Sequence, residues 1–591
     1  ARRVRAARQE LAEPFSAGVY MSEMPELSVR LRDPKSGAPL EGKALRTAGV
    51  KFDTSVDELV GGCGHAALTA GALIKDGTAY CGMAHAVYGL ALMYGSAPLP
   101  GLAARVEEPL QHVVKALQAG EEDNVNNERH MRAFVAAATG NRALACAHWE
   151  ESLLANPLDA LALRCAQTAY LQAGDKVNAL ACVERVMHCF EPTTPAFARA
   201  MGLHARGLFE NGFIAEGERA AGRALTISFE TVNATVATLH GFYKTSRFRE
   251  GHRILRELDH TFEHADDGMP LTALLPELRY LRGVHSIEPA KVLVATAEFD
   301  DRLSIQEDDF FFSSSLLWRL KLVGVDDEFY AAVAQATAQK SSWLPKFPFS
   351  RGGDGGDGEP ANVTTLTDRF RILLPVSGDG VVETLHPVLN VLKVAALIGA
   401  GESARAHEFT NELRRASEQA ATPAPPEAAV PDGGAPLVMG SALLHAQEAL
   451  REVAVPLCDA LLVLARGDFA EAAALLLELR PKFGLLGGDE MQQDMLDQTL
   501  LVAVLQAAQV PVANEVTDEV APYEGDDPSV LYHLWLARAL VNERCSRRSL
   551  SPQTWEWHSR VHHRLGKKAI ADVSALRALD LGLRQGGKDA N

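Results

Sequence analysis

Residues 260–264 read HTFEH, which places two histidines and one glutamate in the order H-x-x-E-H. In zinc hydrolases with this pattern the histidines lie one helical turn apart and bind the metal, while the glutamate activates the bound water. Such an enzyme also needs a further acidic ligand on a packed helix. Here the motif ends a helical run and is followed by Ala-Asp-Asp-Gly, so we expect a solvated helix end instead of a metal centre.

Cys63, His65, Cys81 and His85 form a second group of residue types that bind metals. Four nitrogen and sulfur ligands suffice for a structural zinc ion. However, Cys-x-His is not a usual zinc knuckle. His85 lies in an apolar helical run, so its alternative role is to pack in the core. The sequence leaves zinc at these four residues open, and we predict no cofactor.

Residues 558–568, HSRVHHRLGKK, are basic and directly follow the aromatic stretch TWEW. Basic and aromatic side chains together occur on RNA-binding surfaces. The whole chain of 591 residues carries a net charge of −18, whereas proteins that bind nucleic acid present basic faces to the phosphates. We therefore expect a solvated helix or a docking face for an acidic protein here, and the charge argues against nucleic acid as a partner.

Signatures of other enzyme classes do not occur in the sequence. There is no G-x-S-x-G, no Walker loop and no dinucleotide fingerprint. The glycine-rich run at 351–358 has no strand pattern before it and no helix pattern after it, so it does not read as a phosphate loop. We predict that the chain has no catalytic residue and is not an enzyme. It also lacks an uninterrupted apolar stretch of about 18 residues, so no membrane span is expected.

The elements that carry these residues follow a repeated pattern. Residues 140–163 read GNRALACAHWEESLLANPLDALAL, with Gly140 in a turn, Ala145 at a helix crossing, Trp149 in a core position and Pro157 after the helix. This order matches the second helix of the tetratricopeptide repeat (TPR), whose period is 34 residues. The match predicts a helical hairpin that recurs along the chain.

Small residues mark the predicted crossings, since two helices approach closely only where a side chain is small. Ala145, Ala179, Gly217 and Gly251 are spaced 34, 38 and 34 residues apart. Each hairpin leaves an apolar face that the next one must cover. The pattern returns near the other end of the chain, at Gly401, Ala406 and Leu413 and again at Gly467, Phe469, Ala472, Leu476 and Pro481.

The expected fold is all-α, an α-solenoid of TPR-like helix hairpins with irregular linkers. The abundance of alanine, which favours helices over strands, supports this. The predicted parts are an N-terminal extension (1–50), an N-terminal TPR-like array (51–262), a helical middle segment (263–349), a Gly/Asp-rich linker (350–363), a helical hairpin region (364–420), a Pro/Ala-rich linker (421–436) and a C-terminal TPR-like array with a tail (437–591).

The sequence resembles the tetratricopeptide repeat protein 38 family. The resemblance rests on residues 126–163, 170–190 and 452–501, the last with Pro-Leu-Cys before a helix and Gly-Gly followed by Gln-Gln-Asp. Residues 81–92 add an early helix containing Ala-His, and the likeness spans roughly residues 60–505. It implies an α-solenoid and no particular activity.

One departure from the family concerns a cluster of His and Glu after the third repeat. Here only His240 is present, while Thr238 and Gly241 stand where the family has His and Glu, and residues 270–280 contain no His. A metal-dependent hydrolase built on that cluster is the alternative function, and its residues are largely lost here. A helical-repeat RNA-associated protein is a further alternative.

We expect a non-catalytic protein–protein interaction scaffold, an accessory subunit of a multi-subunit assembly, whose grooves accept a helix or an extended peptide. A clamp for a peptide carboxylate, using Arg132 and Arg164, is a narrower version. The first residues, ARRVRAARQE, are rich in Arg and poor in acid, as in a mitochondrial transit peptide, so a mitochondrial location is expected and a cytoplasmic one is the alternative. The candidate partner contacts on the first helices are Arg132, Arg164, Gln167, Arg199, His204 and His240.

Overall fold

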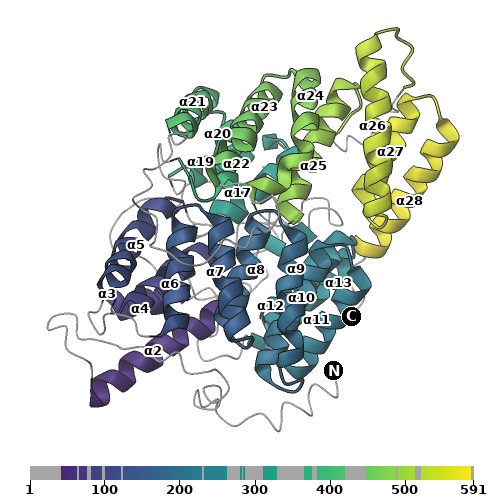
Figure 1. Ribbon diagram of the computed structural model, residues 1–591. Coiled ribbons are helices and arrows are strands. Elements are labelled where there is room, and N and C mark those ends of the chain that lie inside the picture. The colour runs from purple at the N-terminus through teal and green to yellow at the C-terminus, as the bar shows by residue number, and fades with distance from the viewer. Residues whose placement is uncertain are drawn as a thin grey trace, which may run out of the picture.

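A computed structural model shows a chain built of helices (Figure 1). The described residues are 41–62, 66–75, 81–95, 100–120, 124–228, 232–262, 280–281, 284–285, 310–328, 365–375, 382–419, 446–487, 490–512 and 521–586. No strand occurs within these ranges, which confirms the all-α prediction. The same ranges contain no helix that is both long and apolar enough to cross a membrane. The linkers predicted at 350–363 and 421–436 lie outside them, so those boundaries stay predictions.

The N-terminal array consists of antiparallel hairpins that stack in sequence order. Its helices are α2 (Gly42–Gly61), α3 (Ala66–Lys75), α4 (Gly82–Tyr94), α5 (Leu102–Ala119), α6 (Val125–Ala138), α7 (Arg142–Ala155), α8 (Ala160–Gln172), α9 (Lys176–Val186), α10 (Pro195–Glu210), α11 (Ile214–Ile227), α12 (Val232–Lys244) and α13 (Phe248–Phe262). Side-chain caps define several starts: Asn141 accepts a hydrogen bond from the Leu144 amide at 3.1 Å, and Asp159 accepts one from Ala162 at 2.8 Å.

The turn residues between the paired helices share one backbone conformation. Gly140, Gly174 and Gly212 have φ of 81°, 78° and 85°, and Ser246 adopts the same left-handed region with φ of 58°. This conformation ends one helix and starts the next, and glycine adopts it without steric cost. The hairpin period read from the sequence is therefore confirmed at the level of the backbone.

The predicted crossing residues are buried where two helices meet. Ala145 and Ala179 are fully buried, and a Cβ placed on Gly217 of α11 would lie 2.9 Å from the Phe209 ring of α10. Since real Cβ atoms are essentially never found that close to another heavy atom, the small residue sets the distance between the helices. An ion pair between Arg185 and Glu150 joins α9 to α7 of the preceding hairpin.

The remaining helices begin with α17 (Phe310–Leu322) and α19 (Leu366–Leu373). They continue with α20 (Pro387–Gly399), α21 (Ser403–Gln419), α22 (Ala446–Ala449), a π-helical turn (Leu450–Ala454), α23 (Val455–Ala465), α24 (Phe469–Leu479), a 3-10 segment (Arg480–Leu486), α25 (Glu490–Ala507), α26 (Pro528–Arg547), α27 (Pro552–Arg564) and α28 (Lys568–Gly586).

The hydrophobic core forms two clusters that meet at α12. One contains Trp149, Tyr170 and other residues of α2 to α12. The other contains Val236 and Leu239 of α12, the apolar residues of α17 and α20, and the core of α23 to α27, including Trp557. The middle helix α17 therefore packs with the C-terminal helices, and α28 returns to contact α13 (Figure 1).

The first helices of the hairpins form one layer of the N-terminal array, because α4 contacts α6 and α8, and α10 contacts α8 and α12. We call this layer the first-helix face. The helix α2 lies across it and contacts α4 and α8 (Figure 1). Its apolar side chains Phe52, Val56 and Leu59 are at most 2% exposed.

Candidate binding cavity between the two arrays

A cavity of about 410 Å³ lies where α9, α10 and α12 of the N-terminal array approach α25 and α26. Its walls carry basic and acidic side chains in similar number. The basic lining residues are Lys176, Lys244, Arg480, Arg544, Arg547 and Arg548, and the acidic ones are Glu210, Glu490, Asp494, Asp497 and Glu543. Such a cavity is suited to polar or charged groups.

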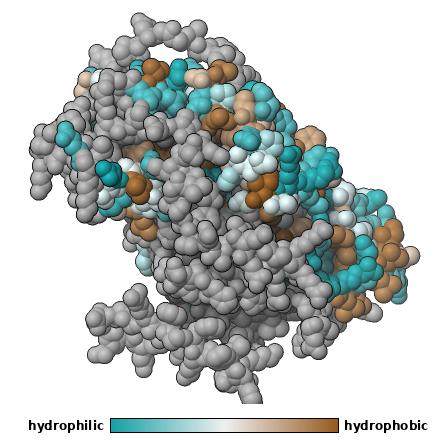
Figure 2. All heavy atoms as spheres, turned by 90° about the horizontal axis from the view of Figure 1, so that it is seen from below, coloured by the Kyte–Doolittle hydropathy of each residue, from teal (hydrophilic) through white to brown (hydrophobic). Residues whose placement is uncertain are grey.

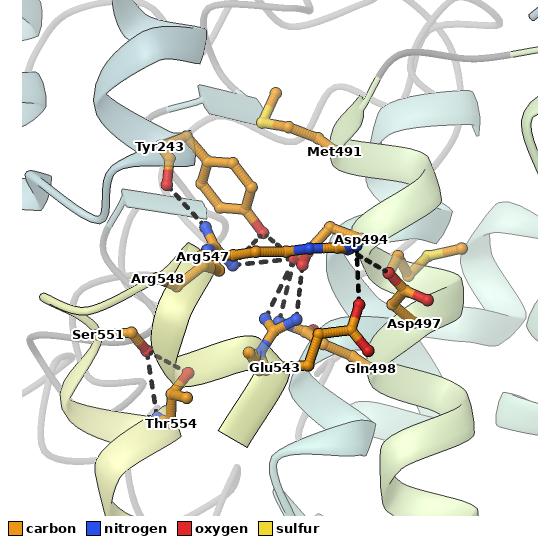
Figure 3. Close-up of polar contacts among 12 residues, drawn as sticks. Tyr243, Met491, Asp494, Asp497, Gln498, Glu543, Arg547, Arg548, Ser551 and Thr554 are labelled. Atoms are coloured by element: carbon orange, nitrogen blue, oxygen red, sulfur yellow. Dashed lines mark hydrogen bonds and ion pairs between the residues drawn. The ribbon is translucent and has the colours of Figure 1, made fainter. Parts of the chain in front are cut away.

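Asp494 of α25 is the centre of this arrangement (Figure 3). Arg544 Nη1 donates to its Oδ1 at 2.6 Å, while Arg548 Nη1 and Arg319 Nη1 donate to its Oδ2 at 2.9 Å and 3.3 Å. Burial alone would raise the pKa of Asp494, but the three guanidinium groups outweigh it and hold that pKa well below its usual range. One carboxylate thus faces three buried cations, which leaves an excess of positive charge.

Tyr243 of α12 connects the N-terminal array to this centre (Figure 3). Its hydroxyl donates to Asp494 Oδ2 at 2.6 Å and accepts from Arg319 Nη1 at 2.8 Å. Arg548 Nη2 donates to the Tyr243 carbonyl at 2.7 Å, and its guanidinium carbon lies 4.0 Å from the ring centroid. Burial raises the pKa of the Tyr243 hydroxyl, so it stays protonated and keeps its donor.

The charged side chains in the outer part of the cavity also form ion pairs. Arg480 donates to Asp497 at 2.8 Å and to both carboxylate oxygens of Glu543 at 2.9 Å, and Lys244 joins α12 to Glu490 of α25. The hydrogen bonds from Arg480 lower the pKa of Glu543, whereas burial and the nearby Glu210 raise the pKa of Glu490. The arrangement is suited to joining the two arrays and to binding charged groups.

Sequence analysis did not identify the residues around Asp494 as functional candidates. Asp494 lies within the Gln-Gln-Asp block that carries the family resemblance, and that block was the available signal. The tyrosine and the arginines are separated from it by up to 251 residues, and no local pattern links residues so far apart. The tertiary fold brings them together, since it places Tyr243 of α12, Arg319 of α17 and the end of α26 beside α25.

Three of the predicted partner contacts are partly accessible and lie beside carboxylates of this chain. Arg132 Nε donates to Glu128 at 2.9 Å within α6. Arg199 of α10 pairs with Asp57 of α2, with 3.0 Å between Nη2 and Oδ2. His204 Nε2 lies 3.3 Å from Glu184.

The other three predicted contacts are buried among helices. Gln167 is fully buried, and its Nε2 donates to the carbonyls of Ala179 and Leu203, which links α8 to α9 and α10. Arg164 and His240 are each 7% exposed. These three side chains lie in the packing between helices, and a direct role for them in partner contact stays a prediction.

The residues considered as metal ligands in the sequence are placed only in part. Cys63 and His65 lie outside the described residues, as do Glu263 and His264 of the HTFEH motif. The Cys81 thiol accepts a hydrogen bond from the Ala84 amide and caps α4, while the His85 ring stacks on His112 at 4.3 Å. Among the described residues, no group of three or more His, Cys, Asp or Glu could hold a metal ion.

The basic run 558–568 forms the end of α27 and the start of α28. His558 is buried and bonded to Ser574 and Asn542. Arg560 and Arg564 donate to backbone carbonyls of Val512 and Ala521, in the connection between α25 and α26. These two arginines therefore join α27 to Val512, which follows α25, and to Ala521, which precedes α26.

In comparisons with known proteins, no protein-family profile matches the sequence. Among solved structures, the human IFIT1 dimer with PPP-AAAA matches at 11% identity with a TM-score of 0.31, over 85% of this chain and 91% of that one. The structure of Naa15/Naa10 bound to HypK-THB matches at 12% identity with a TM-score of 0.22, over 93% of this chain and 89% of that one. At such TM-scores no residue or ligand is carried over; the hairpins themselves show that this chain is a TPR-like helical solenoid.

Proposed function

We propose that this chain is a non-catalytic interaction scaffold whose first-helix face binds a helix of a partner protein. The observation that supports this is α2, which lies on that face. It buries Phe52 and Val56 and adds polar links through Asp57 to Arg199 and through the Val60 carbonyl to Asn233, at 3.0 Å. A surface that packs an amphipathic helix of its own chain has the shape and chemistry for another.

The accessible cations on this face favour a partner helix with acidic residues. Arg132 has a side chain that is 30% exposed and Arg199 one that is 23% exposed, each now paired with a carboxylate of this chain. A partner would offer carboxylates in their place, while Gln167 and Arg164 keep the helices in position. Such exchanged pairs contribute more to specificity than to affinity.

The test is purification from native cells followed by cross-linking and mass spectrometry. Cross-links from a partner should map to α6, α8 and α10, and Arg132→Glu should reduce its capture several-fold. Arg219→Glu is the matched control, because Arg219 is exposed on α11 and also pairs with a glutamate of its own helix. A partner whose cross-links avoid these helices, or capture that falls equally in both variants, argues against the proposal.

Three narrower proposals go with this one. The motifs at 126–163 and 452–501 support kinship with the tetratricopeptide repeat protein 38 family. An accessory role in a larger, mitochondrial assembly is supported by the Arg-rich residues 1–10, and imaging of the tagged protein in cells would test the location. RNA association is the alternative outcome, and an RNA that co-purifies and dissociates with rising salt would favour it.

A further inference from the structure

The last helix, α28, has two apolar faces. Ala571, Ser574 and Leu581 are at most 3% exposed and form its packed face, which contacts α27. On another face Val573, Leu576, Leu579 and Leu583 are between 61% and 69% exposed. These four residues recur every three or four positions, which is the spacing of a helix-packing stripe. We call them the α28 stripe.

The position of the stripe in the fold makes it unusual. Solenoid repeats bury their faces against the next repeat, and the terminal repeat needs a polar outer face. The leucines of the α28 stripe are instead exposed to solvent, and no described residue covers them. Figure 2 shows hydrophobic residues gathered, among hydrophilic ones, at the end of the molecule where Figure 1 places α26 to α28. Tyr532 and Trp535 of α26 are also more than half exposed, and the Lys567 ammonium lies 5.4 Å from the Trp535 ring centroid.

The charges beside the stripe identify the occupant. Arg577 and Asp580 are each 40% exposed and lie near the middle of α28, where Asp580 accepts from Arg577 Nη1 at 3.4 Å and from Arg584 Nε at 2.8 Å. When two copies of one helix pair antiparallel about a twofold axis, the middle of each faces the middle of the other and the same flank meets itself. Arg577 of each copy then faces Asp580 of the second copy, while the leucines interdigitate between them.

We propose that the α28 stripe is a self-association surface that joins two copies of this chain through an antiparallel α28 pair. The leucines supply the buried apolar area and the Arg–Asp flank fixes the antiparallel direction, as flanking charges do in helix pairs. The exposed aromatic residues of α26 extend the surface next to the helix pair.

The experiment is sedimentation of the full chain over a concentration series. We expect a reversible dimer, and Leu576→Glu should raise its dissociation constant at least about tenfold, because it places a carboxylate in the centre of the interface. Leu154→Glu is the matched control: Leu154 is 74% exposed on α7, far from α28 in the sequence. It should leave the dissociation constant unchanged, and an unchanged circular dichroism spectrum shows that each variant is folded.

A charge exchange tests the direction of pairing. Asp580→Arg brings four cations together and should weaken the dimer several-fold, while Arg577→Asp combined with Asp580→Arg should restore it. A chain that is monomeric at every concentration overturns the proposal, as does a dimer that Leu576→Glu leaves intact. A double exchange that fails to restore the dimer overturns the antiparallel pairing. A stripe covered by another segment of this chain would appear as the monomeric outcome.

Discussion

Arg548, in the turn after α26, stacks on the ring of Tyr243 in α12 and donates a hydrogen bond to its carbonyl at 2.7 Å. The two residues are 305 positions apart. Arg548 also donates to Asp494 Oδ2, so one guanidinium holds a helix of the N-terminal array and a helix of the C-terminal array at once. The junction of the two arrays is therefore specific in its geometry, and its central carboxylate is its most sensitive point.

Asp494→Asn should weaken this junction strongly. The substitution removes the carboxylate that faces Arg319, Arg544 and Arg548, and loss of one partner of a buried ion pair costs about 3–5 kcal/mol. We expect a lower melting temperature and faster hydrogen exchange in α25 and α26. Asp468→Asn is the control, since Asp468 pairs with Arg466 on the surface at 3.9 Å, and such pairs contribute about 0–1 kcal/mol. Equal effects of the two substitutions would contradict this role for Asp494.

Replacing either of two glycines of α11 by alanine should change the stability of the fold, in opposite directions at the two positions. At Gly217 a Cβ would lie 2.9 Å from the Phe209 ring, whereas at Gly222 no atom lies within 4 Å. Gly217→Ala should therefore destabilise the array by about 1–3 kcal/mol through overpacking. Gly222→Ala should stabilise it by about 0.5–1 kcal/mol, because alanine loses less backbone entropy in a helix. Thermal unfolding of the two variants measures both changes in stability. A stabilised Gly217→Ala variant would show that this helix crossing tolerates a wider spacing.

The hairpins were predictable from the sequence because their determinants are local. Gly174 with Ala179 and Gly467 with Ala472 fix a turn and a crossing within a few residues, and both appear in the structure as expected. The position of α2 was not predictable in this way. It crosses the boundary expected at residue 50, and its place depends on contacts such as Asp57 with Arg199, 142 residues away.

In the candidate cavity, too, only the features set by local sequence were predictable. The sequence supplies Asp494 within a distinctive block but not its partners, because the arginines that surround it come from α17 and from the end of α26. Conversely, Gln167 occupies the predicted position on a first helix, yet its side chain bonds the neighbouring helices instead of pointing to solvent. The repeat position identifies the helix, while the neighbouring hairpins decide which side chains remain accessible.

Ser246→Gly should stabilise the turn between α12 and α13. Ser246 has φ of 58°, and its buried hydroxyl has no hydrogen-bond partner in the described structure. Glycine removes both penalties, and a left-handed conformation costs a residue with a side chain about 1–2 kcal/mol. Gly212→Ala makes the reverse change at the equivalent turn, where φ is 85° and space is open, and should destabilise by about 1 kcal/mol. A Ser246→Gly variant that melts below the parent would show that the serine is held by a contact the turn requires.

Acidification should destabilise the fold through buried histidines. Burial lowers the pKa of His285 and of His386 to about 3 each, while an unfolded histidine titrates near about 6.5. The native state therefore keeps these rings neutral, and stability falls as the pH drops below about 6.5, because the unfolded chain then binds protons that the folded chain excludes. Between about pH 6 and pH 4 each group contributes up to about 1.4 kcal/mol per pH unit.

His285→Gln isolates one of these groups. The neutral His285 ring donates from Nε2 to the Leu239 carbonyl at 3.1 Å, and a glutamine amide can replace that donor without titrating. The variant should lose some stability at pH 7, since the ring also packs against Tyr243 and Phe248. Its stability should nevertheless fall less steeply with acid, and His285→Gln with His386→Gln should remove both contributions. Melting temperatures measured from pH 7 to pH 4 report the slopes. Parallel curves for parent and double variant would mean that the two histidines accept protons in the folded chain, and that other groups set its sensitivity to acid.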